Sequence, residues 1–153
     1  MLGPMADAGA PRPSDDFNQR VIDEFRANEG RVGPPFEGAP MILVHHRGRK
    51  SGTERVNPMV FRPVDGAFAI FASKAGAPDH PDWYFNLIDS PVTTAEVGAE
   101  QRGATVQVRV RELQGAERDR VWEAQKAASP GFAEYETKAA PRVIPVLLLE
   151  PTG

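Results

Sequence analysis

The sequence contains no cysteine, and no apolar run reaches the roughly 20 residues that a membrane-spanning helix needs. Without cysteine the chain has no disulfide, no thiolate nucleophile and no cysteine ligand for a metal. The N-terminus lacks an apolar segment behind a basic start, so no secretory signal is expected. Together these absences predict a cytoplasmic protein.

The chain also lacks any excess of positive charge. Its 18 Lys and Arg residues and 21 Asp and Glu residues give a formal net charge of -3. Bulk attraction to nucleic acid is therefore not expected. A length of 153 residues suits one domain with a sizeable core. Met1–Ser14, rich in Gly, Ala and Pro, is interpreted as a disordered leader, and residues 15–153 as the domain.

Several catalytic motifs are missing. No Gly-x-Ser-x-Gly elbow is present for a serine hydrolase, and no Gly-x-Gly-x-x-Gly follows a strand. Lys50-Ser51 is similar to the end of a P-loop, but Arg49 stands where that motif needs Gly. His45 and His46 are adjacent in a predicted strand, so they point to opposite faces and cannot share a metal. No metal site is expected.

Apolar periodicity predicts a mixture of helices and strands. The helices are expected at 14–28, 82–88, 117–128 and 132–138, and the strands at 41–46, 55–62, 67–73, 93–97, 105–111 and 143–150. Most connections between strands are too short for a crossover helix, so the strands should pair antiparallel. The expected fold is α+β, a small barrel or closed sheet of about six antiparallel strands with peripheral helices.

The turn at residues 47–55, called the basic turn below, concentrates cations. Arg47, Arg49, Lys50 and Arg55 lie between two apolar runs, and Gly48 and Gly52 let the backbone bend. Such a turn suits an anionic ligand with phosphate or carboxylate groups. The alternative is a solvated hairpin tip whose cations serve solubility only.

Two further segments are candidates for a binding site. The strand-exit loop, residues 72–78, repeats the pattern of a hydroxyl, a cation and small residues at the end of a strand. Trp83-Tyr84-Phe85 cannot all face one core from a single helix, so at least one ring should lie at the surface. That ring could stack on a planar ligand, or the Trp could simply pack under the barrel rim. Tyr135, on one helical face with Phe132 and Lys138, could cap a pocket or be a half-buried packing residue.

Taken together, these segments resemble the deazaflavin-dependent nitroreductase family. The resemblance rests on four motifs in the family's order, from about Phe17 to Glu150. They are Gly48-Arg49-Lys50-Ser51-Gly52 with Arg55 and Pro58, then Ala72-Ser73-Lys74-Ala75-Gly76, then Trp83-Tyr84-Phe85-Asn86-Leu87, and Phe132-x-x-Tyr135-x-x-Lys138 before Arg142-x-Ile144-Pro145-Val146. The resemblance implies an antiparallel split β-barrel that binds the deazaflavin coenzyme F420.

The resemblance also implies which residues contact the cofactor. Its phosphate and oligoglutamate tail would be held by Arg49, Lys50, Ser51 and Arg55. The strand beside the cofactor would contribute Val56, Asn57, Pro58, Met59 and Val60, with Pro58 and Met59 near the ring system. The deazaflavin would be contacted by Ala72, Ser73 and Lys74 and closed in by Trp83, Tyr84, Phe85 and Asn86.

The implied activity is hydride transfer from the reduced deazaflavin to a quinone-like or nitroaromatic acceptor. Ser73 and Tyr135 are the expected catalytic residues, orienting the acceptor or stabilising its developing oxyanion. Other readings are an FMN-dependent split-barrel oxidoreductase, a non-catalytic carrier of deazaflavin or lipid, and an oligomeric scaffold. A homodimer is a further expectation. Peripheral attachment to a membrane through the leader is another, although no residue pattern supports it.

Overall fold

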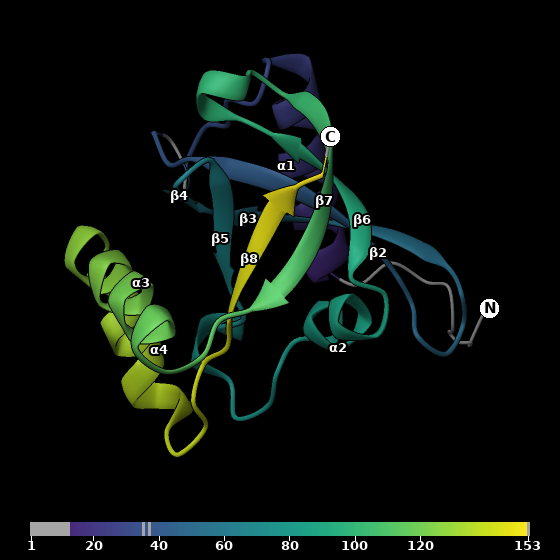
Figure 1. The fold of residues 1–153 in the computed structure, drawn as a ribbon. Coiled ribbons are helices and arrows are strands. Elements are labelled where there is room, and N and C mark those ends of the chain that lie inside the picture. The colour runs from purple at the N-terminus through teal and green to yellow at the C-terminus, as the bar shows by residue number, and fades with distance from the viewer. Residues whose placement is uncertain (1–12, 35, 37, 153) are drawn as a thin grey trace.

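The computed structural model describes residues 13–34, 36 and 38–152 and shows an α+β fold (Figure 1). Its helices are α1 (Pro13–Ala27), α2 (Asp82–Asp89), α3 (Gly115–Ala128) and α4 (Gly131–Ala139), with short 3-10 turns η1 (Lys74–Gly76) and η2 (Ala99–Gln101). Its strands are β2 (Met41–Arg47), β3 (Glu54–Val60), β4 (Arg62–Val64), β5 (Ala67–Phe71), β6 (Val92–Val97), β7 (Ala104–Glu112) and β8 (Val146–Pro151). Residues 1–12 of the expected leader lie outside the described residues, and its last two residues belong to α1.

The strands form one sheet of seven in the order β3-β2-β6-β7-β8-β5-β4. Every neighbouring pair is antiparallel, as predicted. The strand predicted at 55–62 is two strands, because Phe61 leaves the ladder and its N–H donates to the carbonyl of Pro40 at 3.1 Å. β3 and β4 follow each other in the chain but lie at opposite edges of the sheet, so the sheet must curl into a half-barrel (Figure 1).

Three apolar clusters fill the two faces of this sheet. The interior cluster contains Ile42, Val44, Phe61, Phe68, Ile70, Leu87, Ala95, Val97, Val108, Val110, Leu147 and Leu149. Met41 and Leu43 face the other way, against Val21, Ile22 and Phe25 of α1. Phe71, Val146 and Leu148 likewise turn outward against α3 and α4. β2, β5 and β8 are thus buried on both faces, which explains their continuous apolar sequence.

β7 has only one buried face. Val108 and Val110 are buried and Val106 is partly buried, while Gln107, Arg109 and Arg111 are exposed. This is the alternation that the sequence predicted for the strand. No helix in the described part of the chain is both long and apolar enough to cross a membrane.

α1 is tied to the sheet by one carboxylate. Arg26 donates to Glu96 from Nε at 2.9 Å and from Nη2 at 2.7 Å, and His45 Nε2 lies 2.7 Å from the same carboxylate. The hydrogen bond from Arg26 holds the pKa of Glu96 below its usual range. His45 therefore belongs to the α1 face of the sheet, whereas His46 faces the opposite side.

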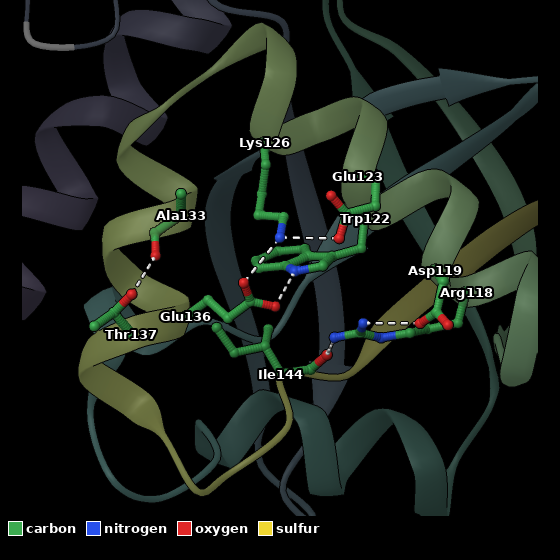
Figure 2. Close-up of polar contacts among 9 residues, drawn as sticks. All are labelled: Arg118, Asp119, Trp122, Glu123, Lys126, Ala133, Glu136, Thr137 and Ile144. Carbon is green, nitrogen blue, oxygen red and sulfur yellow. Dashed lines mark hydrogen bonds and ion pairs between the residues drawn. The ribbon is translucent and has the colours of Figure 1, made fainter.

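α3 and α4 are joined through a buried indole (Figure 2). Trp122 Nε1 donates to Glu136 Oε2 at 2.6 Å, and Lys126 Nζ lies 2.8 Å from Glu136 Oε1. That hydrogen bond from Lys126 lowers the pKa of Glu136. Arg118 donates to the carbonyl of Ile144 at 2.7 Å, so α3 is also attached to the segment that enters β8. These contacts fix the position of α4.

Replacing Glu96 tests the attachment of α1. Glu96→Gln should lower the free energy of unfolding by about 1 kcal/mol at pH 7. The expected loss is this small because Arg26 is half exposed and water screens its ion pair with Glu96. The folded-state pKa of Glu96 is lowered, so its contribution is present above the unfolded value of about 4.3 and is lost as pH falls through the folded value. Urea unfolding at several pH values measures both effects.

The matched control is Glu100→Gln, at an exposed carboxylate in η2. It should change the free energy of unfolding by less than about 0.5 kcal/mol. Equal effects of the two variants at pH 7 would show that Glu96 does not anchor α1.

Candidate functional site

The basic turn is a tight hairpin between β2 and β3. Gly48 N–H donates to the carbonyl of Thr53 at 2.9 Å, and Thr53 N–H donates to Ser51 Oγ at 3.1 Å. A Cβ on Gly48 would lie 2.6 Å from Ser51 Oγ, so a larger residue there would displace the Ser51 hydroxyl. Ser51, a predicted phosphate ligand, therefore uses a lone pair to stabilise the turn.

The cations of the turn remain available to a ligand. Arg49, Lys50 and Arg55 are exposed, and none of them pairs with a carboxylate within the described residues. Arg47 alone has an acidic neighbour, with Nη2 3.6 Å from Glu54 Oε2. A cluster of unpaired cations on an acidic protein favours the anion-binding interpretation over a purely solvated tip.

A buried hydrogen-bond network attaches the turn to α2 and β3. Asn86 Oδ1 accepts from the Arg49 backbone N–H at 3.1 Å and from Arg49 Nη1 at 3.3 Å. Asn86 Nδ2 lies 3.0 Å from His46 Nδ1, and His46 Nε2 lies 2.7 Å from Asn57 Oδ1. Burial lowers the pKa of His46. Two predicted cofactor residues, Asn57 and Asn86, are thus joined by His46, to which the sequence had assigned no such role.

The aromatic residues of α2 diverge, as predicted. Trp83 and Tyr84 pack against the interior cluster, whereas Phe85 is exposed. The Arg49 guanidinium carbon lies 4.9 Å from the centroid of the Phe85 ring. Tyr84 donates to Glu112 Oε1 at 2.9 Å, and burial together with this bond raises the pKa of Tyr84 to about 12. The Tyr84 hydroxyl therefore stays protonated at neutral pH.

The strand-exit loop is organised by Arg142. Its guanidinium donates to the carbonyls of Ala72 at 3.0 Å, Ser73 at 2.8 Å and Ala77 at 2.8 and 3.0 Å. It also lies 2.8 Å from His80 Nδ1, which must accept because arginine only donates. Burial, followed by the charge of Arg142, lowers the pKa of His80.

The backbone of this loop has a shape that suits an anion or a carbonyl oxygen. Ser73 is right-handed helical (φ -76, ψ -36), and Lys74 and Ala75 are left-handed (φ 49 and 54). A right-handed residue followed by a left-handed one points successive N–H groups into one concavity. Lys74 Nζ, 3.2 Å from Asp79 Oδ2, lies on the same loop.

α4 packs closely on the same loop. A Cβ on Gly76 would lie 2.8 Å from Lys138 Cβ and 3.1 Å from the carbonyl of Tyr135, so only glycine allows this approach. Tyr135 is half-buried, with its ring centroid 5.4 Å from that of Phe132. Ser73 and Tyr135, the two predicted catalytic residues, therefore come from elements in contact.

The basic turn and the strand-exit loop are linked through the start of α2. Arg49 lies over Phe85, the Phe85 ring centroid is 5.8 Å from that of His80, and His80 is bonded to Arg142. Arg142 in turn holds the carbonyl of Ser73. The structure thus joins predicted site residues from both segments into one region.

Some predicted cofactor residues of β3 pack against apolar clusters. Val56 and Val60 pack against the cluster under α1, and Met59 packs against the interior cluster. Pro58 pairs with Leu43, whose side chain also belongs to the α1 cluster. Asn57 alone on this strand bonds to the His46 network, so the contribution of its neighbours to a cofactor site stays a prediction.

The residues present fit a planar cofactor with an anionic tail. Exposed cations lie at one end of the region, an amide concavity lies at the other, and an exposed aromatic ring lies between. No three His, Asp or Glu side chains within the described chain are grouped to hold a metal ion.

Comparison with known proteins identifies the family and the fold. The family model described as F420H(2)-dependent quinone reductase matches residues 18–151. An F420H(2)-dependent quinone reductase of Mycobacterium tuberculosis strain H37Rv is 30% identical over 129 residues, which cover 82% of this chain and 83% of that protein.

Two solved structures agree with this match. An F420-H2 dependent reductase is 38% identical with a TM-score of 0.64, over 72% of this chain and 94% of that one. A second, described as a domain-swapped dimer, is 32% identical with a TM-score of 0.65, over 91% and 100%. The predicted split barrel and the resemblance read from the motifs are confirmed, and the chain belongs to the F420H(2)-dependent quinone reductase family.

Proposed function

We propose that the protein reduces a quinone with a hydride from reduced coenzyme F420, which binds along the basic turn, α2 and the strand-exit loop. The observation that carries the proposal is that a chain of this family has three cations in the basic turn with no carboxylate partner among the described residues, and an amide concavity in the strand-exit loop. When bound, the reduced deazaflavin supplies the hydride, and the protein supplies binding, orientation and electrostatic field.

The chain's own residues divide this work. Arg49, Lys50 and Arg55 hold the phosphate and carboxylates of the tail by charge-assisted hydrogen bonds. The amides that follow Ser73 receive a carbonyl oxygen of the ring. Phe85, which is 37% exposed, contributes the accessible part of its ring to a planar group.

Ser73 and Tyr135 act on the acceptor. Their hydroxyls donate hydrogen bonds to the quinone oxygen on which negative charge develops, and one of them or solvent delivers the proton. Arg142 fixes the carbonyl of Ser73, and Gly76 lets α4 place Tyr135 against the same loop. A nitroaromatic acceptor would meet the same two hydroxyls and is a second substrate class to screen.

FMN binding and a carrier function are the alternatives that an experiment must separate. FMN has a shorter anionic tail, so fewer cations of the basic turn would contribute to its affinity. A carrier would bind deazaflavin tightly without turnover on any acceptor. Titration of the purified protein with F420 and with FMN, followed by a quinone and nitroaromatic screen, distinguishes the three functions.

Removing one cation of the basic turn should weaken cofactor binding. Lys50→Ala should raise the Kd for F420 about tenfold, because one charge-assisted contact to the tail is lost. The dependence of Kd on salt should also become weaker. Fluorescence titration at two salt concentrations measures both effects.

Arg120→Ala is the control for charge, since it removes an exposed cation from α3. It should leave the Kd for F420 within about twofold of the wild type. Equal binding by Lys50→Ala and the wild type would contradict the assignment of the tail to the basic turn.

Removing the two hydroxyls should slow turnover more than it weakens binding. Ser73→Ala and Tyr135→Phe should each lower kcat for a quinone at least tenfold while the Kd for F420 changes less than about threefold. Thr137→Ala, an exposed position also on α4, should have wild-type kcat. Unchanged kcat in both site variants would show that neither hydroxyl acts on the acceptor.

A homodimer is proposed only as a property to measure. Its support is that a relative with 32% identity was described as a domain-swapped dimer. Sedimentation equilibrium of the full chain, with and without F420, gives the oligomeric state directly.

A further inference from the structure

His46 is a buried polar residue whose function the proposed hydride transfer leaves unexplained. Its exposed fraction is 5%, and its ring lies between the side-chain amides of Asn57 and Asn86. A buried imidazole with both nitrogens bonded to protein is a specific arrangement, because each bond constrains its partner.

The hydrogen-bond directions in this network follow from one fixed donor. The Arg49 backbone N–H can only donate, so the atom of Asn86 that it meets must be the carbonyl oxygen. Asn86 Nδ2 then faces His46 Nδ1 and donates to it. His46 Nδ1 therefore carries no proton, and Nε2 carries the proton that it donates to Asn57 Oδ1. Only the neutral Nε2–H tautomer satisfies every bond.

We propose that His46 is a positioning residue of the cofactor site: as the neutral Nε2–H tautomer it fixes the amides of Asn57 and Asn86 and, through Asn86, the backbone of the basic turn at Arg49. Its effect on cofactor binding rests on the function proposed above. With Oδ1 engaged by His46, the Nδ2 group of Asn57 has no hydrogen-bond partner among the described residues.

Protonation of His46 would break this arrangement. A proton on Nδ1 would face Asn86 Nδ2, and the amide would have to turn and release the Arg49 N–H. Burial, Arg55 on β3 and His45 on β2 oppose the charge, while the hydrogen bond to Asn57 and the carboxylate of Asp82 on α2 favour it, and the pKa of His46 is lowered overall. Because the folded pKa lies below the unfolded value of about 6.5, the network is intact above that pH and is lost as pH falls through the folded value.

The ligand-free test uses NMR of the apo protein. At pH 7, long-range ¹H–¹⁵N correlation should show a proton on Nε2 of His46 and none on Nδ1. The same tautomer should be present somewhat below pH 6.5. Hydrogen exchange of the Arg49 amide should be at least about tenfold faster in His46→Leu and within about threefold of wild type in His45→Gln. A proton on Nδ1 at pH 7, or unchanged exchange in His46→Leu, would overturn the proposal.

The binding test uses F420 titrations between pH 5 and 8. The Kd of His46→Leu should be about tenfold higher than that of wild type at pH 7. His46→Gln keeps one donor and one acceptor but does not titrate, so its Kd should rise less than that of wild type as pH falls. Protonation of F420 itself affects wild type and His46→Gln equally, so it cancels in the ratio of their Kd values.

The outcomes separate this inference from the proposed function. Binding by wild type with an equal Kd in His46→Leu would overturn the positioning role and leave the function standing. Absence of binding by wild type would overturn the function, and the Arg49 exchange rates would still decide whether His46 orders the basic turn. A pH dependence that persists in His45→Gln and is flatter in His46→Gln would assign the effect to His46.

Discussion

The site depends on the way the chain passes from one edge of the sheet to the other through a single residue. β3 ends at Val60 and β4 begins at Arg62, and these strands are the two ends of the sheet order. Phe61 between them is buried, and its ring meets that of Phe68 edge-on at 5.5 Å. β5 then runs back antiparallel to β4, so the strand-exit loop returns to the end of the barrel from which β3 started. The basic turn and the loop share that end for this reason.

Charge is distributed to match this geometry. Acidic side chains are paired where helices meet the sheet or each other, as Glu96 is with Arg26 and Glu136 is with Lys126. The basic turn instead keeps Arg49, Lys50 and Arg55 without acidic partners within the described residues. A chain with net charge -3 thereby has a local cluster of positive charge. Such a cluster suits a small anion, whereas the net negative charge gives no bulk attraction to nucleic acid.

Much of the architecture could be read from the sequence because local patterns determine it. The alternating valines predicted the buried face of β7, and the short connections predicted antiparallel pairing. Patterns could not show that Phe61 interrupts a strand, because the interruption depends on a carbonyl at Pro40, 21 residues earlier in the chain. Nor could sequence patterns show which side of β3 carries Val56 and Val60. Their surroundings depend on the element that packs on this edge strand, which is the α1 cluster.

The candidate site shows the same division. The cations of the basic turn and the rings of α2 were visible in the sequence, whereas the structural roles of His46 and Arg142 were not. An apolar run predicted that His46 would lie in a strand, but its partners come from two other elements. Arg142 bonds to carbonyls 65 to 70 residues away, and a carbonyl has no sequence signature.

Arg142 has a consequence for the electric field of the strand-exit loop. The acceptors of its guanidinium are carbonyls and an imidazole nitrogen, and the carboxylate of Asp79 acts on it through space without a hydrogen bond. Arginine keeps its charge even where burial lowers its pKa. A partly buried charge is screened by salt much less than an exposed one. The charge of Arg142 at the loop end of the candidate site is therefore screened by salt less than the charges of the exposed basic turn.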